Sequence, residues 1–259
     1  MIQFDEEHLE AIERQRHSAS GAAKQRRWMA LLGPHPGDRV LDVGCGTGPF
    51  SRLVAERVAP DGRVVGVDVA PEAIDLANQL ADGTDRGLLS FDVADAASLP
   101  FDDATFDGAV CISVLDFCEE PEAALLELHR VLRPGGRLVV ASSDQDTRVY
   151  YSHDRELGRR VMQAIADRAH DPWIARRLTH LLAVTGFHQL DEVVVTDVEH
   201  EFRPGGAGYV LAHGFRDHLV TKPTIGKESY EAWLADLDTC ERQGCAFYSV
   251  TTYGYLARR

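Results

Sequence analysis

The chain has 259 residues, of which 44% are hydrophobic and 26% are charged, a composition typical of a globular protein. Lys and Arg number 27 and Asp and Glu number 41, so the formal net charge is 27 − 41 = −14. A surface this negative repels phosphate backbones, which argues against nucleic acid as a substrate or partner.

The first half of the chain reads as a helical segment followed by alternating strands and helices. A helix is predicted over residues 5–32, which Gly33-Pro34 and Pro36-Gly37 bring to an end. Strands are predicted at 39–43, 63–67, 88–93, 106–113 and 137–141, and a leucine-faced helix at 121–132. Strands separated by helices imply a doubly wound α/β fold with a parallel sheet and right-handed crossovers.

Beyond residue 142 the alternation loosens. Residues 144–170 are polar and are predicted to be helical in part. Strands are expected at 190–198 and 246–256, and the segment 203–243 shows two helical patterns after a glycine-rich loop. Tyr230 and Trp233 lie on the second of these helices, and we expect them to form the core of a small cap rather than a substrate platform.

Cysteine usage and the hydrophobic segments favour a cytoplasmic protein. The five cysteines are an odd number and include no CxxC pair, so neither a disulfide framework nor a metal site is expected. The first residues, MIQFDEEHLE, are acidic and lack the apolar stretch of a signal peptide. No apolar run approaches the ~18 residues that a membrane span needs.

The chemistry is expected around LDVGCGTG, Leu41 to Gly48, where the first predicted strand turns into a helix. Gly44, Gly46 and Gly48 leave room for a ligand against the backbone, and Cys45 and Thr47 lie between them. The N-terminus of the following helix offers free N–H groups. In an open α/β sheet, ligands bind at the carboxyl ends of the strands.

A glycine-rich turn alone does not separate a dinucleotide from other ligands. Pro49 stands where the third glycine of a dinucleotide motif belongs. Asp42 precedes the loop, and a carboxylate there would repel a pyrophosphate but attract an ammonium or sulfonium group. Asp68 ends the next strand, where it can accept from ribose hydroxyls, and Asp92 ends the third strand, where it can accept from an adenine amine. These acids disfavour a nicotinamide-dependent dehydrogenase.

Several ordered motifs between Gly37 and Ala141 resemble class I S-adenosylmethionine-dependent methyltransferases, especially the branch of ubiquinone and menaquinone biosynthesis and of many natural-product enzymes. They are GDRVLDVGCGTG, GRVVGVDVAPEAIDLA and FDVADAASLPFDDATFDGAVCISVLDFCEEPEAALLELHRVLRPGGRLVV. The resemblance implies a seven-stranded, mostly parallel Rossmann-like sheet whose last strand is antiparallel. It also implies methyl transfer from S-adenosylmethionine to an O, N or C atom of a small molecule, such as a secondary metabolite or a quinone-like compound.

The resemblance also implies roles for residues at the strand ends. Asp42 and the loop Gly44–Gly48 would hold the methionine part of the cofactor, and Asp68 the ribose. Val69 would lie beside the adenine, whose edge Asp92 and Val93 would contact. Ile112 and Ser113 would line the site near the sulfonium.

One family feature is missing from the fourth-strand loop. Relatives often carry a histidine two residues after the leucine of this loop, but here the sequence is Leu115-Asp116-Phe117. The role of that histidine therefore cannot be transferred. We expect Phe117 to pack on the cofactor or the acceptor. Asp116 could face either the sulfonium or solvent, and of the two we favour solvent.

The remaining segments are expected to complete a single domain of residues 1–259. Residues 1–36 would form a helical lid with contacts such as Trp28 or Arg16, and residues 37–142 the cofactor-binding core. The insertions 143–172 and 203–243 would form a cap over the acceptor pocket. They contain His153 and His213, the candidates for a general base if the acceptor must lose a proton.

The sequence leaves two questions open. The chain is predicted to be an enzyme, but a protein that binds the cofactor and acts as a partner or regulator would carry the same motifs. The acceptor and the choice between monomer and homodimer are not readable from the residues.

Overall fold

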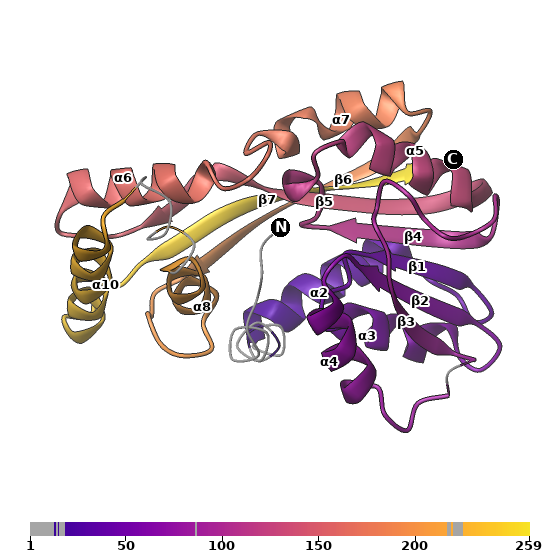
Figure 1. Cartoon of the computed structure of the whole chain (residues 1–259), viewed down its shortest axis with the longest axis horizontal. Helices are drawn as coiled ribbons and strands as arrows, with labels where there is room; N and C mark the ends of the chain where they lie inside the picture. Colours follow the sequence, from indigo (N-terminus) through magenta and orange to yellow (C-terminus); the bar gives the residue numbers. More distant parts are fainter. Residues whose placement is uncertain (1–12, 14, 16–18, 86, 217–218, 220–224) are drawn as a thin grey trace.

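The computed structural model describes residues 13, 15, 19–85, 87–216, 219 and 225–259. In chain order its strands are β1 (Arg39–Val43), β2 (Arg63–Asp68), β3 (Leu89–Val93), β4 (Phe106–Ile112), β5 (Leu132–Tyr150), β6 (His188–Glu199) and β7 (Tyr248–Arg258). They form one sheet of order β3-β2-β1-β4-β5-β7-β6 (Figure 1). β1 to β5 pair in parallel, whereas β7 runs antiparallel to β5 and β6. The predicted doubly wound fold with a reversed last strand is confirmed.

Most helices begin and end close to the residues that the sequence predicted. They are α2 (Ala19–Leu32), α3 (Pro49–Val58), α4 (Pro71–Leu80), α5 (Pro121–Val131), α6 (Arg155–Ala166), α7 (Ile174–Val184), α8 (Ala207–Gly214) and α10 (Lys227–Arg242), with a short 3-10 helix η1 (Leu115–Phe117). Proline opens α3, α4 and α5, at a position where the missing N–H has no helical partner. Among the described residues, none of the helices combines the length and hydropathy needed to cross a membrane.

Helices cover both faces of the parallel part of the sheet. The side chains of α5 and α7 pack with Leu41 and Val43 of β1 on one face. Those of α2, α3 and α4 pack with Val40 on the other. Residues 40–43 of β1 are therefore all buried, as expected for a parallel strand between two helical layers. Asp42 shares the face of Val40 and is the polar exception in this run.

The strand β5 is much longer than predicted. It pairs with β4 up to Ala141 and then continues beside β7 to the pair Tyr150–Tyr248. The expected strand end at residue 141 is wrong, and the expected helix within 144–170 is confined to α6. The predicted division at residues 142 and 143 consequently falls inside a strand. The sequence did not predict this extension, because its residues are largely polar and its pairing partner β7 lies about 100 residues later in the chain.

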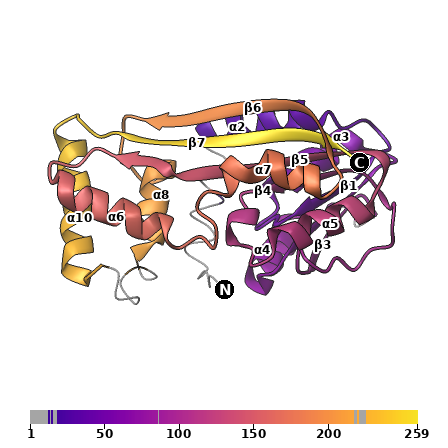
Figure 2. The same cartoon turned by 90° about the horizontal axis from the view of Figure 1, so that it is seen from above.

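The helices α6, α8 and α10 gather at the far end of the long strands (Figures 1 and 2). We call these three helices the cap. Their apolar side chains form a third cluster, separate from the two clusters that flank the sheet. Tyr230 and Trp233 are fully buried in it, so their expected place in the core of a cap is confirmed.

The helix α2, which precedes β1, does not hold Trp28 as expected. Trp28 of α2 is buried, and its ring lies where a side chain of Gly254 would be, with Cζ3 2.2 Å from the position of a Cβ there. Trp28 therefore packs between α2 and β7, and its expected contact as part of a lid is wrong. Arg16 and the lid residues 1–12, 14, 17 and 18 lie outside the described residues.

Candidate functional site

The carboxyl ends of β1 to β4 lie side by side on one edge of the sheet. Val43 at the end of β1 is in register with Val67 of β2 and Cys111 of β4, and Asp68 is in register with Val93 of β3. The segments that follow these strands therefore come together. We call this region the carboxyl edge. It brings together the loop 44–48 and the predicted site residues that end β2, β3 and β4.

The glycine loop follows β1 and bends toward β2, because the N–H groups of Gly44 and Cys45 both donate to the carbonyl of Val67. Gly44, Gly46 and Gly48 have positive φ angles of 70°, 55° and 77°, which favour glycine. A Cβ on Gly44 would lie 2.1 Å from Cγ2 of Val114, and one on Gly48 would lie 2.4 Å from Cζ of Phe91. These two glycines thus accommodate the protein's own side chains.

Gly46 differs from its two neighbours. Apart from its chain neighbours Cys45 and Thr47, no described residue has an atom within 4 Å of the position of a Cβ on Gly46. Its N–H donates to Oδ2 of Asp68 over 2.9 Å. Of the three glycines that were expected to make room for a ligand, Gly46 is therefore the one whose backbone faces open space, beside the carboxylate of Asp68.

Two of the predicted acids converge on Cys45. Asp42 is buried and accepts from the hydroxyl of Ser51 over 2.5 Å, and Asp68 accepts from the N–H groups of Gly46 and Ala70. Burial, followed by the charges of Asp42 and Asp68, raises the pKa of the Cys45 thiol well above its usual value. Cys45 is therefore a neutral thiol packed among carboxylates, in agreement with its expected role as a small filler.

The third acid lies at the end of β3 with apolar neighbours. Asp92 is exposed, Val93 is 53% exposed and Val69, one residue beyond β2, is 45% exposed. Since β2 and β3 are paired at Asp68 and Val93, these valines come from adjacent strand ends. Exposed valines beside a carboxylate offer apolar contact and a hydrogen-bond acceptor to a flat heterocycle.

The end of β4 carries the other predicted contacts. Ile112 is half-buried, and Ser113 has a positive φ of 59° while its N–H donates to the carbonyl of Ala141 over 2.7 Å. Phe117 in η1 is 39% exposed. Asp116, in contrast, is only 1% exposed, so the expectation that it faces solvent is wrong. The short helix η1 turns its side chain inward, toward Gln145 of β5.

An ion pair joins the loop to residue 13. Thr47 donates its hydroxyl to a carboxylate oxygen of Glu13 over 2.5 Å, and Arg52 pairs with the other oxygen. Arg52 also donates to the carbonyl of Thr47 over 2.7 Å. Sequence reasoning missed this contact, because nothing in the pattern of residues 5–32 marks Glu13 as different from the other acids. It also missed Phe91 and Val114, whose side chains fill the spaces left by Gly48 and Gly44.

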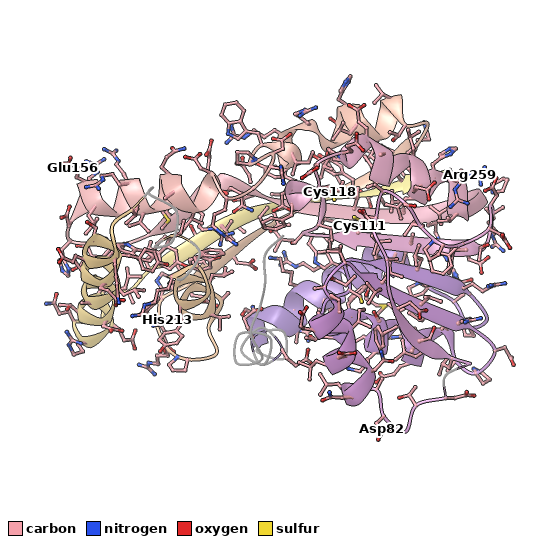
Figure 3. All side chains as sticks on the ribbon, viewed as in Figure 1. Asp82, Cys111, Cys118, Glu156, His213 and Arg259 are labelled. Atoms are coloured by element: carbon pink, nitrogen blue, oxygen red, sulfur yellow. The ribbon has the colours of Figure 1, made fainter. Side chains whose placement is uncertain are left out.

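The two histidine candidates lie on the cap. His153 follows β5, and its Nδ1 lies 2.8 Å from Asp236 and 3.4 Å from the sulfur of Cys240. Along β7, six residues separate the pairs Ala141–Gly254 and Tyr150–Tyr248, which is ~20 Å at the usual rise per residue. His213 stacks on Tyr209 with ring centroids 4.0 Å apart, and Figure 3 shows it on the cap, far from Cys111 of β4. The structure does not bring either histidine to the carboxyl edge.

His153 belongs to a group that can hold a metal ion. One donor atom each from His153, Cys240 and Cys245 lies within 4.8 Å of the others. Such nitrogen and sulfur donors suit Zn²⁺. The absence of a metal site therefore remains a sequence-based prediction.

Residues 41–140 match a family model described as a methyltransferase domain. A curated O-methyltransferase of Penicillium expansum is 35% identical over 175 residues, covering 67% of this chain and 59% of that protein. An uncharacterized 37.1 kDa protein of a transposon in Streptomyces fradiae is 33% identical over 228 residues, covering 88% of this chain and 64% of that protein. The chain thus spans between about half and two thirds of the length of its first curated relatives.

The fold also resembles that of a solved structure with a different named activity. The crystal structure of the 4+2 cyclase SpnF matches with a TM-score of 0.57 and 25% identity, covering 92% of this chain and 81% of that one.

Proposed function

We propose that this chain, which carries a class I S-adenosylmethionine-dependent methyltransferase domain, transfers the methyl group of that cofactor to a small-molecule acceptor. The observation that carries the proposal is the backbone of Gly46, which faces open space within the loop and donates its N–H to the carboxylate of Asp68. The named O-methyltransferase relative supports an oxygen atom as the acceptor, ahead of nitrogen or carbon.

The carboxyl edge fits the cofactor in its three parts. Asp42 and the Gly44–Gly48 loop would hold the methionine part, because a carboxylate attracts its ammonium group. Asp68 keeps acceptor capacity for ribose hydroxyls beside its two backbone bonds. Val69 and Val93 would contact the adenine, with Asp92 accepting from its amine. When bound, the cofactor supplies a methyl group already activated by a positively charged sulfur.

The protein's own task is to bind and to orient. An acceptor atom must lie ~3 Å from the methyl group and in line with the bond that breaks, with water excluded. Ile112, Ser113 and Phe117 at the end of β4 would line that position. The carboxylates Asp42, Asp68 and Asp92 act at the ends of the cofactor that do not react, so they contribute affinity rather than rate.

The cofactor assignment is tested by titration calorimetry with S-adenosylmethionine. We expect Asp68→Ala to weaken binding at least tenfold, since it removes a charged hydrogen-bond acceptor worth roughly 1.5–3 kcal/mol. Asp82→Ala is the matched control, because Asp82 is an exposed residue just after α4 that accepts from the N–H of the adjacent Gly83. Equal affinities of the wild type and Asp68→Ala would refute the assignment.

Turnover needs a separate measurement, because a solved relative of the same fold is named a cyclase and because binding alone would also fit a partner or regulator. A screen with methyl-labelled S-adenosylmethionine against phenols, hydroxy acids, amines and quinones would detect transfer. Label in at least one acceptor supports the proposed function. Tight cofactor binding without label in any acceptor would favour the non-catalytic alternative.

A further inference from the structure

A group of polar residues, three of them buried and the fourth, Arg168, half-buried, lies between η1, the extension of β5 and the cap. Asp116 comes from η1, three residues after Ser113 at the carboxyl edge. Gln145 and Arg148 come from β5 beyond Ala141, and Arg168 follows α6. We call these four residues the buried arginine cluster. Its members thus connect η1, at the carboxyl edge, with the part of β5 and the end of α6 that lead to the cap.

Hydrogen bonds connect three members of the cluster but leave polar atoms unused. Gln145 donates to Oδ2 of Asp116 over 3.1 Å, and Arg148 donates to Oε1 of Gln145 over 3.0 Å. Arg148 also donates to the hydroxyl of Tyr248 over 2.6 Å. Asp116 Oδ1 and Arg148 Nε have no partner in the part of the chain that the structure describes. Both residues are more than nine-tenths buried, with exposed fractions of 1% and 6%.

The charge of Arg168 has fewer polar partners than that of Arg148. The guanidinium carbon of Arg168 lies 4.1 Å from the ring centroid of Phe215, and that of Arg148 lies 6.0 Å from the same centroid. The Nε atom of Arg168 is buried and lacks a hydrogen-bond partner among the described residues. Burial, followed by repulsion from Arg148, lowers the pKa of Arg168 to about 10.

The cluster therefore carries an excess of positive charge in a buried place. Two guanidinium groups lie near a single carboxylate, and Asp116 reaches Arg148 only through Gln145. Buried charges without partners are destabilising, so such an arrangement is characteristic of a binding site rather than of a core. The groups face each other from η1, β5, the end of α6, Phe215 and Tyr248 of β7.

We propose that the buried arginine cluster binds an oxyanion group of the methyl acceptor, a carboxylate or a phosphate. Arg148 and Arg168 donate to the oxyanion, and Asp116 Oδ1 accepts a hydrogen bond from a hydroxyl of the same molecule. The acceptor is thus a small hydroxylated organic acid. This inference rests on the proposed function, because it assigns the cluster to the acceptor of that reaction.

The first test compares an anion with its neutral ester. Binding of 4-hydroxybenzoate and of methyl 4-hydroxybenzoate is measured by titration calorimetry with the full chain saturated with S-adenosylmethionine. We expect the anion to bind at least tenfold more tightly than the ester. Phenyl phosphate and benzoate distinguish a phosphate from a carboxylate, and inorganic phosphate reports the oxyanion alone. Equal affinity for the anion and the ester, or no binding of any of these anions at millimolar concentration, would overturn the proposal.

The second test uses a pair of charge-matched variants. Arg168→Gln should abolish the preference for the anion, whereas Arg159→Gln, at an exposed position of α6, should leave it unchanged. Arg168→Gln should also raise the melting temperature without ligand, because it relieves repulsion from Arg148. An Arg168→Gln variant that keeps the preference would contradict the proposal.

The cofactor affinity separates this proposal from the proposed function. If S-adenosylmethionine binds and neutral acceptors alone become labelled, the inference about the acceptor fails while the function stands. If the cofactor does not bind, the function itself fails.

Discussion

The carboxyl edge and the buried arginine cluster use polar groups in opposite ways. At the edge, Asp42 and Asp68 accept hydrogen bonds from Ser51, Gly46 and Ala70, and the open position is the backbone of Gly46. In the cluster, distant segments bring Asp116, Arg148 and Arg168 together, and each retains a buried polar atom without a partner among the described residues. The comparison indicates that the carboxyl edge is a well hydrogen-bonded scaffold, whereas the buried arginine cluster is held in a costly arrangement.

Within the carboxyl edge, we expect the largest difference in mutational effect between Gly48 and Gly46. Gly48→Val should lower the free energy of unfolding by about 3 kcal/mol or more, because the new side chain meets Phe91 and φ is positive. Gly46→Val should cost about 1–2 kcal/mol, from its φ angle alone, yet remove most of the cofactor affinity. Urea unfolding and calorimetry measure the two effects. If Gly46→Val unfolds as easily as Gly48→Val, the two glycines do not have separate roles.

The buried arginine cluster should make the stability of the protein depend on pH, through the ionisation of Asp116. Burial raises the pKa of Asp116 from 3.8 to about 6. Well below pH 3.8 the carboxyl is protonated in both the folded and the unfolded chain, and its contribution to stability is lost as the pH rises through 6. The shift corresponds to roughly 3 kcal/mol.

We therefore expect Asp116→Asn to exceed the wild type in stability at pH 8 by up to that amount, and this advantage to vanish near pH 4. Asparagine retains an oxygen that can accept from Gln145. Urea midpoints at both pH values measure the difference between the two proteins. An advantage that is the same at pH 4 and pH 8 would show that ionisation of Asp116 is not its source.

A smaller effect is expected where Glu13 meets the loop. Arg52→Ala removes the donor to the carbonyl of Thr47 and the ion pair with Glu13. We expect a several-fold loss of cofactor affinity, about 1 kcal/mol, because the loop is less well held. Arg57→Ala, at an exposed position later in α3, is the control and should bind as the wild type does.

The smallest effects on activity are expected for the cap histidines. His153→Ala removes a bond to Asp236 and should lower stability by about 1 kcal/mol, while methyl transfer stays within twofold of the wild type. His213→Ala should leave both unchanged, since its ring lies on the exposed side of the cap. A loss of turnover with intact cofactor binding in either variant would make that histidine a candidate base again.

The same comparison explains how far sequence reasoning reached. The position of the carboxyl edge was predictable, because each of its residues lies at the end of an apolar strand or just after it, and the parallel sheet aligns the strand ends. The length of β5 was not predictable, since the polar residues after Ala141 give no sign in the sequence that this stretch pairs with β7 on either side of Gln145 and Arg148. Asp116 was misjudged for the same reason, because only the fold places it against β5. Residue spacing carries no information about contacts between segments so far apart.

The length of β5 and β7 also bears on how this chain can be re-engineered. Both strands run from the parallel core into the cap, and their described pairing has one register shift, between Asp144 and Val149 of β5. A graft that exchanges the cap for that of a relative must cut two paired strands at matching positions and preserve their register. Chimaeras joined at a loop boundary near residue 142 would sever hydrogen-bonded backbone. Variation of acceptor preference is therefore more accessible through single side chains than through swapped segments.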